Sequence, residues 1–257
     1  MNKFINAFIK PLLGWLGLFL TWEVVVRLKI WPTWIFPSPK RVFAVLLDLA
    51  ADGALLPSVL VSLRRLSFGF AIAVLIGTLI GLGLARNKNL KQIFGGLILG
   101  LQTLPSICWL PLALLWFGLN EKAILFVVFM GAFLSITVAV EGAVRTIPPL
   151  YVRVGKMFKL SRLALYRRII LPAMLPNFVT GLKQGWAFAW RSLMAGEMLF
   201  ITAGLGQLLM VGRELNNIAQ VMAVMLTIVV LGLLIDVLVF GTIERQLHQK
   251  WGFAKRT

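Results

Sequence analysis

The chain has 257 residues, of which 60% are hydrophobic and 14% charged, and its formal net charge is +17. Ordinary soluble domains carry about 25% charged residues, so this composition excludes a water-soluble globular protein, and the apolar content excludes a disordered chain. With one cysteine, Cys108, and one histidine, His248, the chain lacks the residues for a disulfide scaffold, a histidine-ligated metal centre or a histidine-based triad. We therefore expect a membrane protein that is not itself an enzyme and binds no metal.

Six segments are long and apolar enough to cross a membrane, whose hydrocarbon core requires about 20 apolar residues. They cover residues 11–28, 59–85, 93–115, 123–140, 173–201 and 218–243. Lys3 and Lys10 precede the first segment without a small-residue cleavage site after it, so it is predicted to be a retained anchor. The predicted fold class is an all-α integral membrane protein with six transmembrane helices in one domain, residues 1–257.

The basic residues predict how these spans are oriented. If the N-terminus is inside, the cytoplasmic regions are the N-terminus, 86–91, 141–171 and the tail from Glu244, and together they hold 16 basic residues. The outer segments hold fewer. The positive-inside rule therefore predicts that both termini are cytoplasmic.

Two features of the chain before residue 120 suggest special geometry. Pro39 can start a helix over about 40–52, whose apolar residues recur at helical spacing, and this helix is predicted to lie on the outer surface. Pro105 and Pro111 each remove a backbone hydrogen bond from the segment 93–115. We expect a bend there, with a cavity beside the bend as an alternative to simple packing.

The longest segment outside the spans, 141–171, interleaves basic and apolar residues. This pattern predicts one or two short helices with one apolar and one basic side. Such a segment either lies on anionic lipid headgroups or docks into a groove on a soluble partner. Because it ends at the start of the span 173–201, movement of a docked segment would reach that span.

A series of short motifs, taken in order and spacing over nearly the whole chain, resembles one protein family. The motifs are Phe36-Pro37-Ser38-Pro39, Ser62-Leu63 with Arg65 and Gly69-Phe70, Gln102-Thr103-Leu104-Pro105, Trp116-Phe117-Gly118, Leu160-Ser161-Arg162, Arg167-Arg168-Ile169-Ile170-Leu171-Pro172, Thr180-Gly181-Leu182, Ala189-Trp190-Arg191, Glu197-Met198, Gly204-Leu205-Gly206, Asp236, Glu244, Arg245 and Trp251. The chain resembles the permease subunits of ATP-binding-cassette (ABC) importers, in the branch that serves aliphatic sulfonates, taurine, nitrate and similar anions. The resemblance implies the compact importer permease fold with a cytoplasmic coupling helix.

The resemblance also implies how the chain obtains energy. In this family a coupling helix meets a separate ATPase, and the matching residues are Val154, Gly155, Lys156, Met157, Phe158, Lys159, Leu160, Ser161, Arg162, Leu163 and Leu165. Family members usually carry Glu and Gly where this chain has Arg153 and Lys159, whereas Leu171-Pro172 keeps the family pattern. No phosphate-binding Gly-x4-Gly-Lys-Ser/Thr sequence is present, so ATP and Mg²⁺ are expected on the partner.

The implied partners are a dimer of ATPase subunits, a second permease copy and an extracytoplasmic substrate-binding protein. The implied location is a bacterial inner membrane. Nucleic acid is not expected as a partner, because the basic residues are explained by membrane orientation.

Ionisable residues inside spans are costly and therefore mark candidate sites. The predicted substrate pathway consists of Lys183, Trp186, Trp190, Arg191 and Arg65, with the cations attracting an anion and the indoles facing an alkyl tail. The alternative is structural, with lipid-facing indoles and paired charges.

Two carboxylates are expected to pair with cations within the membrane. Glu197 is a candidate partner of Arg191, and Asp236 of Arg65 or Arg191, because an unpaired buried carboxylate would take up a proton.

Three other functions compete with an importer subunit: a self-sufficient secondary carrier for a small anion, an intramembrane enzyme acting on lipid, and a scaffold. No internal repeat supports a carrier. No cluster of nucleophile and base supports an enzyme. The expected cargo is a small anion, with alkyl sulfonate, taurine, nitrate and bicarbonate all open, and a neutral heterocycle is the remaining alternative.

Overall fold

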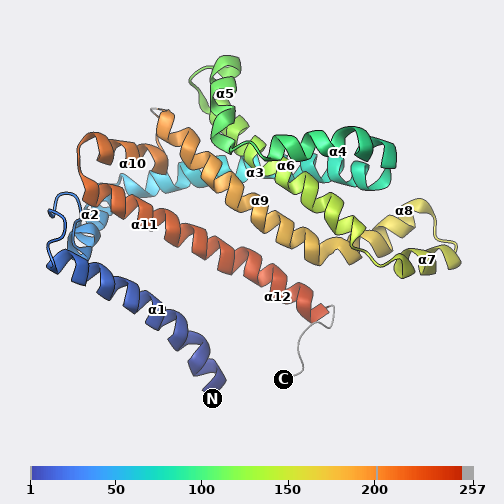
Figure 1. Cartoon of the computed structure of the whole chain (residues 1–257), viewed down its shortest axis with the longest axis horizontal. Coiled ribbons are helices and arrows are strands. Elements are labelled where there is room, and N and C mark those ends of the chain that lie inside the picture. Colours follow the sequence, from blue (N-terminus) through green and yellow to red (C-terminus); the bar gives the residue numbers. More distant parts are fainter. Residues whose placement is uncertain (1, 201, 251–257) are drawn as a thin grey trace. The chain divides into compact units, whose positions relative to one another are not determined.

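A computed structural model of the chain describes residues 2–200 and 202–250, and every regular element in this part is a helix (Figure 1). Ile201, the expected end of one span, and Trp251, one of the motif residues, lie outside the described residues. The helices are α1 Asn2–Arg27, α2 Pro39–Ala51, α3 Leu55–Arg86, α4 Lys88–Gln102, η1 Ser106–Trp109, α5 Leu110–Phe117, α6 Glu121–Arg145, α7 Pro149–Met157, α8 Arg162–Leu165, η2 Tyr166–Ile170, α9 Leu171–Leu199, α10 Leu205–Glu214, α11 Ile218–Ile235, η3 Asp236–Phe240 and α12 Gly241–Lys250. The short elements are a 3-10 helix, η1, and two π-helices, η2 and η3.

Helices occupy all six predicted spans. Three of them, α3, α6 and the stretch Ile218–Leu247, are long and apolar enough to cross a membrane, and the bent pair of α4 with η1–α5 is a fourth candidate. The remaining two predicted spans fall in α1 and α9, which have 26 and 29 residues. At 1.5 Å per residue, both helices exceed the roughly 30 Å thickness of a hydrocarbon core.

The segment expected to form one span over 93–115 is instead two helical pieces. The axes of α4 and η1–α5 differ by 102° across a break of three residues, Thr103 to Pro105. Pro105 cannot donate a backbone hydrogen bond to continue α4, whereas Pro111 lies in the first turn of α5, where its missing N–H costs nothing. The prolines therefore end one helix and start another.

Side chains cap several helices at residues that the sequence makes suitable for this role. The Ser38 hydroxyl accepts a hydrogen bond from the Arg41 amide, with Pro39 at the first position of α2, as predicted for the surface helix. Asn87 caps α4 and Asn120 caps α6 in the same way. These caps fix where the helices begin.

By its internal contacts the chain divides into two units, Met1–Leu60 with Ala203–Val230 and Val61–Thr202 with Leu231–Thr257. In the first unit, Val42 of α2 is buried with Ala219 and Ala223 of α11. The Trp22 indole of α1 donates to the carbonyl of Pro37 over 3.0 Å.

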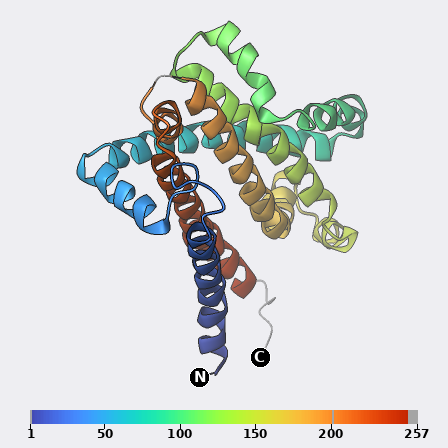
Figure 2. The ribbon, with the colours of Figure 1, turned by 60° about the vertical axis from the view of Figure 1, so that its left-hand side comes forward.

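The second unit is built around α6, which runs beside α9 in both views (Figures 1 and 2). Small residues let its neighbours approach closely. A Cβ added to Gly81 of α3 would lie 2.7 Å from the backbone oxygen of Thr137 on α6, and one at Gly181 of α9 would overlap Ala139. Small residues that let helices approach closely are typical of membrane proteins.

Candidate functional site

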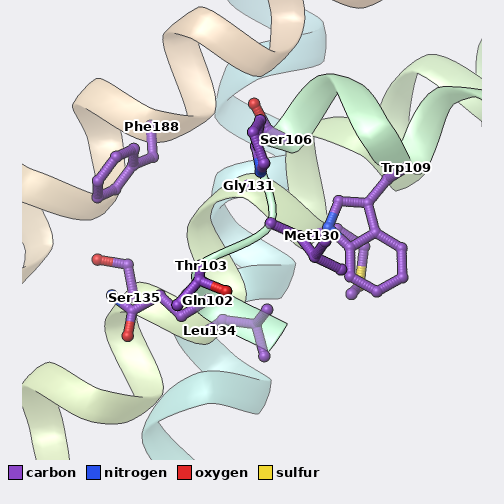
Figure 3. A pocket seen from close by; sticks show the side chains of 11 residues that line it. Gln102, Thr103, Ser106, Trp109, Met130, Gly131, Leu134, Ser135 and Phe188 are labelled. Atoms are coloured by element: carbon purple, nitrogen blue, oxygen red, sulfur yellow. The ribbon is translucent and has the colours of Figure 1, made fainter. Parts of the chain in front are cut away.

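The break between α4 and η1 opens a pocket of about 220 Å³, so of the two alternatives left open for the bend the structure has the cavity. Side chains from the break, from α6 and from α9 surround it (Figure 3). Its lining residues are Gln102, Thr103, Leu104, Pro105, Ser106, Trp109, Met130, Gly131, Leu134, Ser135 and Phe188. We call this the break pocket.

The break pocket offers neutral polar groups on an apolar wall. Gln102, Ser106 and Ser135 bring an amide and two hydroxyls to it, while the Thr103 hydroxyl donates to the carbonyl of Gly100 over 2.7 Å. None of its described lining residues is ionisable. Such donors can hydrogen-bond an anion without the tight binding that a full countercharge would give, which suits a site that a solute enters and leaves.

None of the five predicted pathway residues lines the break pocket. Lys183 forms an ion pair with Asp236 of η3, with 2.9 Å between the Nζ and Oδ1 atoms. Trp186 packs between Phe70 of α3 and Phe240 of η3, at ring-centroid distances of 5.0 and 6.2 Å. Its indole Nε1 is buried and has no hydrogen-bond partner within the described residues.

The other two predicted pathway residues on α9, Arg191 and Trp190, do not line the break pocket either. Arg191 is exposed, and its guanidinium carbon lies 5.4 Å from the ring centroid of Phe188. Trp190 is half-buried against the core of the second unit. Phe188 is the residue by which α9 reaches the break pocket, so the cation over its ring is a neighbour of that pocket rather than a part of its wall.

Arg65 belongs to a buried charge cluster that joins α3, α6 and α9. Only 5% of Arg65 and none of Glu197 is exposed, and Nη1 of Arg65 lies 3.0 Å from Oε1 of Glu197. The Ser62 hydroxyl lies 2.7 Å from Oε2 of the same carboxylate. At the edge of the cluster Glu121 pairs with the exposed Arg64 over 2.7 Å and with Arg65 over 3.4 Å.

This geometry corrects two expected pairings. Asp236 contacts Lys183 rather than Arg65 or Arg191, and Glu197 contacts Arg65 rather than Arg191. Both carboxylates do have a cationic partner, but helix packing decides which cation comes close. Residues far apart in sequence, such as 65 and 197, meet because α3 and α9 both pack on α6.

The segment expected to contact an ATPase forms two short helices joined by a turn. The helix α7 ends at Met157 and α8 begins at Arg162. The loop was expected to start at 141, but α6 continues to Arg145, so the loop starts after that residue. A Cβ at Gly155 would overlap Leu165 and lie 2.6 Å from the Ile169 side chain, so this glycine allows α7 to pack against α8 and η2. The backbone of Lys159 has φ 50°, the left-handed conformation that favours glycine.

This coupling segment, residues 154–165, exposes large apolar side chains. Met157 is 82% exposed, Phe158 76% and Leu163 78%. An apolar pocket of about 430 Å³ adjoins it, lined by Leu150, Tyr151, Val154, Arg168, Ile169, Pro172 and Ala173. The sequence pattern indicated the apolar side of this segment but not the pocket, which is lined by residues of α7, of η2 and of the start of α9.

Within the described part of the chain, no group of three or more His, Cys, Asp or Glu side chains is placed to hold a metal ion.

Comparison with known proteins places the chain among transport proteins. The family model of the binding-protein-dependent transport system inner membrane component matches residues 73–247. The bicarbonate transport system permease protein of Synechococcus elongatus is 28% identical over 242 residues, which cover 90% of this chain and 87% of that protein. The taurine transport system permease protein of Escherichia coli is 26% identical over 230 residues, covering 87% and 84%.

A solved structure shows the same fold. A chain of the MetNI methionine ABC transporter, in an inward-facing conformation, superposes with a TM-score of 0.66 at 20% identity, covering 77% of this chain and 98% of that one. The family match extends over more than half of the chain, including the break pocket and the coupling segment. This protein therefore belongs to the family of binding-protein-dependent transport system inner membrane components, the permease subunits of ABC importers.

Proposed function

We propose that the chain forms the membrane pathway for a small anion such as an alkyl sulfonate, taurine, nitrate or bicarbonate. ATP and Mg²⁺ bind to a separate pair of ATPase subunits, which contact the coupling segment. Two permease copies pair in the membrane, and a soluble binding protein delivers the solute from outside. Both termini lie in the cytoplasm.

The observation that carries this proposal is the exposed apolar surface of the coupling segment. Met157, Phe158 and Leu163 are each more than three-quarters exposed, at a position next to basic residues and outside the apolar spans. Exposed apolar groups rimmed by polar residues are typical of protein–protein contacts. Large apolar side chains that enter a groove on a partner carry most of the energy of such a contact.

The test is a mild-detergent purification of the full chain from its native membrane, with identification of every co-purifying protein. We expect an ATPase with a phosphate-binding loop to co-purify, and we expect Phe158→Glu to abolish its recovery. The control is Leu119→Glu, because Leu119 is 76% exposed but lies in the turn between α5 and α6. Equal recovery with both variants would contradict the proposed coupling surface.

The energy source separates an importer from a self-sufficient carrier. In right-side-out membrane vesicles we expect uptake to require two additions: ATP inside the vesicle and the binding protein outside it. Uptake of the anion by the chain alone, in vesicles without ATP, would support the carrier instead.

The anion pathway is proposed to include the break pocket, with Arg191 adjacent through Phe188 and with Lys183, Trp186, Trp190 and Arg65 as further candidates. Ser135 faces this pocket from α6, and its side chain is small enough that Ser135→Ala leaves the helix packing intact. We expect Ser135→Ala to raise the KM for the anion several-fold while ATPase recovery stays unchanged. Ser67→Ala on α3 is the matched control, since Ser67 is exposed and does not line the break pocket. An unchanged KM in Ser135→Ala would exclude Ser135 from the pathway.

A further inference from the structure

A third pocket lies where α3 ends, and it is the more basic: two arginines line it, whereas one lines the 430 Å³ pocket and none lines the break pocket. It has a volume of about 460 Å³ and is lined by Leu82, Gly83, Arg86, Arg162, Leu163 and Tyr166. Two of these six residues are arginines, and none is acidic. We call it the Arg86 pocket.

The two guanidinium groups of this pocket are available to a ligand. The guanidinium carbon of Arg86 lies 5.9 Å from the ring centroid of Tyr166, a cation–π contact that orients the group without using its N–H donors. Within the described residues neither Arg86 nor Arg162 forms an ion pair. Paired guanidinium groups match the oxygen geometry of a phosphate, which they bind in a bidentate manner.

An apolar stripe on α3 leads away from the Arg86 pocket. Leu82, Leu79 and Leu75 precede Arg86 by 4, 7 and 11 residues, so all four side chains share one face of the helix. Leu79 and Leu75 are each 63% exposed. From Arg86 to Leu75 the helix rises roughly 16 Å, about the half-thickness of a hydrocarbon core.

We propose that the Arg86 pocket binds an anionic phospholipid. Its phosphate lies between Arg86 and Arg162, and one acyl chain follows the stripe of Leu82, Leu79 and Leu75 into the membrane. A charged recess at the end of a span, continued by an apolar stripe one leaflet long, matches the two chemical parts of such a lipid. Basic pockets at helix ends bind anionic headgroups for the same reason.

Arg162 and Leu163 also belong to the coupling segment, so the ATPase is the competing occupant of this pocket. The apolar stripe favours the lipid. Leu75 lies eleven residues inside a membrane-spanning helix, where a soluble protein does not reach but an acyl chain does. The site thus adds a lipid ligand to the chain and does not depend on the proposed coupling.

Native mass spectrometry of the full-length protein, released from detergent micelles, tests the proposal. Phosphatidylglycerol, phosphatidylcholine with the same acyl chains, and glycerol phosphate are titrated separately. We expect phosphatidylglycerol to bind most tightly, and Arg86→Gln and Arg162→Gln each to weaken it about fivefold, the equivalent of about 1 kcal/mol per basic residue. Arg167→Gln is the matched control, because Arg167 is equally exposed and basic but does not line the Arg86 pocket.

Three results would overturn the proposal. Binding of glycerol phosphate as tightly as phosphatidylglycerol would show a site for free anions. An equal loss of phosphatidylglycerol in Arg167→Gln would show diffuse charge attraction rather than a site. Loss of ATPase recovery in Arg86→Gln, with phosphatidylglycerol binding unchanged, would assign the pocket to the ATPase.

Discussion

The positively charged Arg65 lies in the interior of the second unit. It forms ion pairs there with the fully buried Glu197 and the partly exposed Glu121. Desolvating two charges costs several kcal/mol, and their attraction offsets this cost only when the geometry is good. The hydroxyl of Ser62 adds a neutral donor to the same carboxylate. Removing one partner therefore matters far more at Arg65 than at the solvent-exposed Arg64.

We predict that Arg65→Met lowers the free energy of unfolding by about 3 to 5 kcal/mol, because it leaves the Glu197 carboxylate buried without its cation. Arg64→Met, which removes an exposed pair, should cost less than about 1 kcal/mol. Thermal unfolding in detergent measures both, and the double variant Arg65→Met with Glu197→Leu should recover most of the loss. If the double variant is as unstable as Arg65→Met, the unpaired Glu197 carboxylate is not the cause of the lost stability.

The backbone of Lys159 adopts the left-handed conformation. This conformation costs a residue other than glycine about 1 to 2 kcal/mol. Lys159→Gly is predicted to raise the unfolding midpoint, since it removes this strain and little packing. Lys156→Gly, in the last turn of α7, is predicted to lower the midpoint, because glycine at a helical position costs up to about 0.5 to 1 kcal/mol relative to other residues. Opposite signs for the two variants are the expected result, and a shared sign would rule out the backbone explanation.

Among the elements, α3, α6 and α9 depend on close backbone approach. Gly81 and Gly83 both lie on α3, but an added Cβ at Gly81 would meet the backbone of Thr137, whereas nothing lies within 4 Å of one at Gly83. The space around each glycine therefore decides whether α3 tolerates a larger residue at that position.

Gly81→Ala is expected to destabilise the protein by about 1 to 3 kcal/mol through overpacking. Gly83→Ala, two residues away, should be neutral or stabilising, because alanine favours the helix by about 1 kcal/mol. The comparison requires only thermal unfolding of two single variants. Equal midpoints would mean that α3 can move away from α6 at no cost.

For the whole molecule, the distribution of basic residues predicts the direction of insertion. In a Cys108→Ser background, Leu119→Cys should react in intact cells with a thiol reagent that does not cross membranes, whereas Met157→Cys should react only after the cells are opened. Both side chains are more than three-quarters exposed, so accessibility within the protein does not distinguish them. The reverse labelling pattern would invert the proposed topology and remove the coupling segment from the cytoplasm.

The sequence predicted those parts of this structure that depend on local chemistry. Apolar runs located the helical segments of the six expected spans, Pro39 located the start of α2, and Pro105 and Pro111 located the bend, whereas the helix α10 was not predicted. The 102° angle at the break was not predictable, because a proline ends a helix without fixing the direction of the next one. Nor were the partners of Glu197 and Asp236, since ion pairs between distant residues depend on the rotation of each helix about its axis.

The absence of a gap between α8, η2 and α9 has a mechanical consequence. Residues from Arg162 to Leu199 follow one another in helical conformation without an intervening turn, over roughly 55 Å. The stretch is not a uniform α-helix, because η2 is a π-helix and Pro176, inside α9, removes one backbone hydrogen bond. Under the proposed ATPase contact, a displacement at Ser161 would be carried along this continuous backbone toward Glu197, and η2 and Pro176 are the places where the stretch would bend.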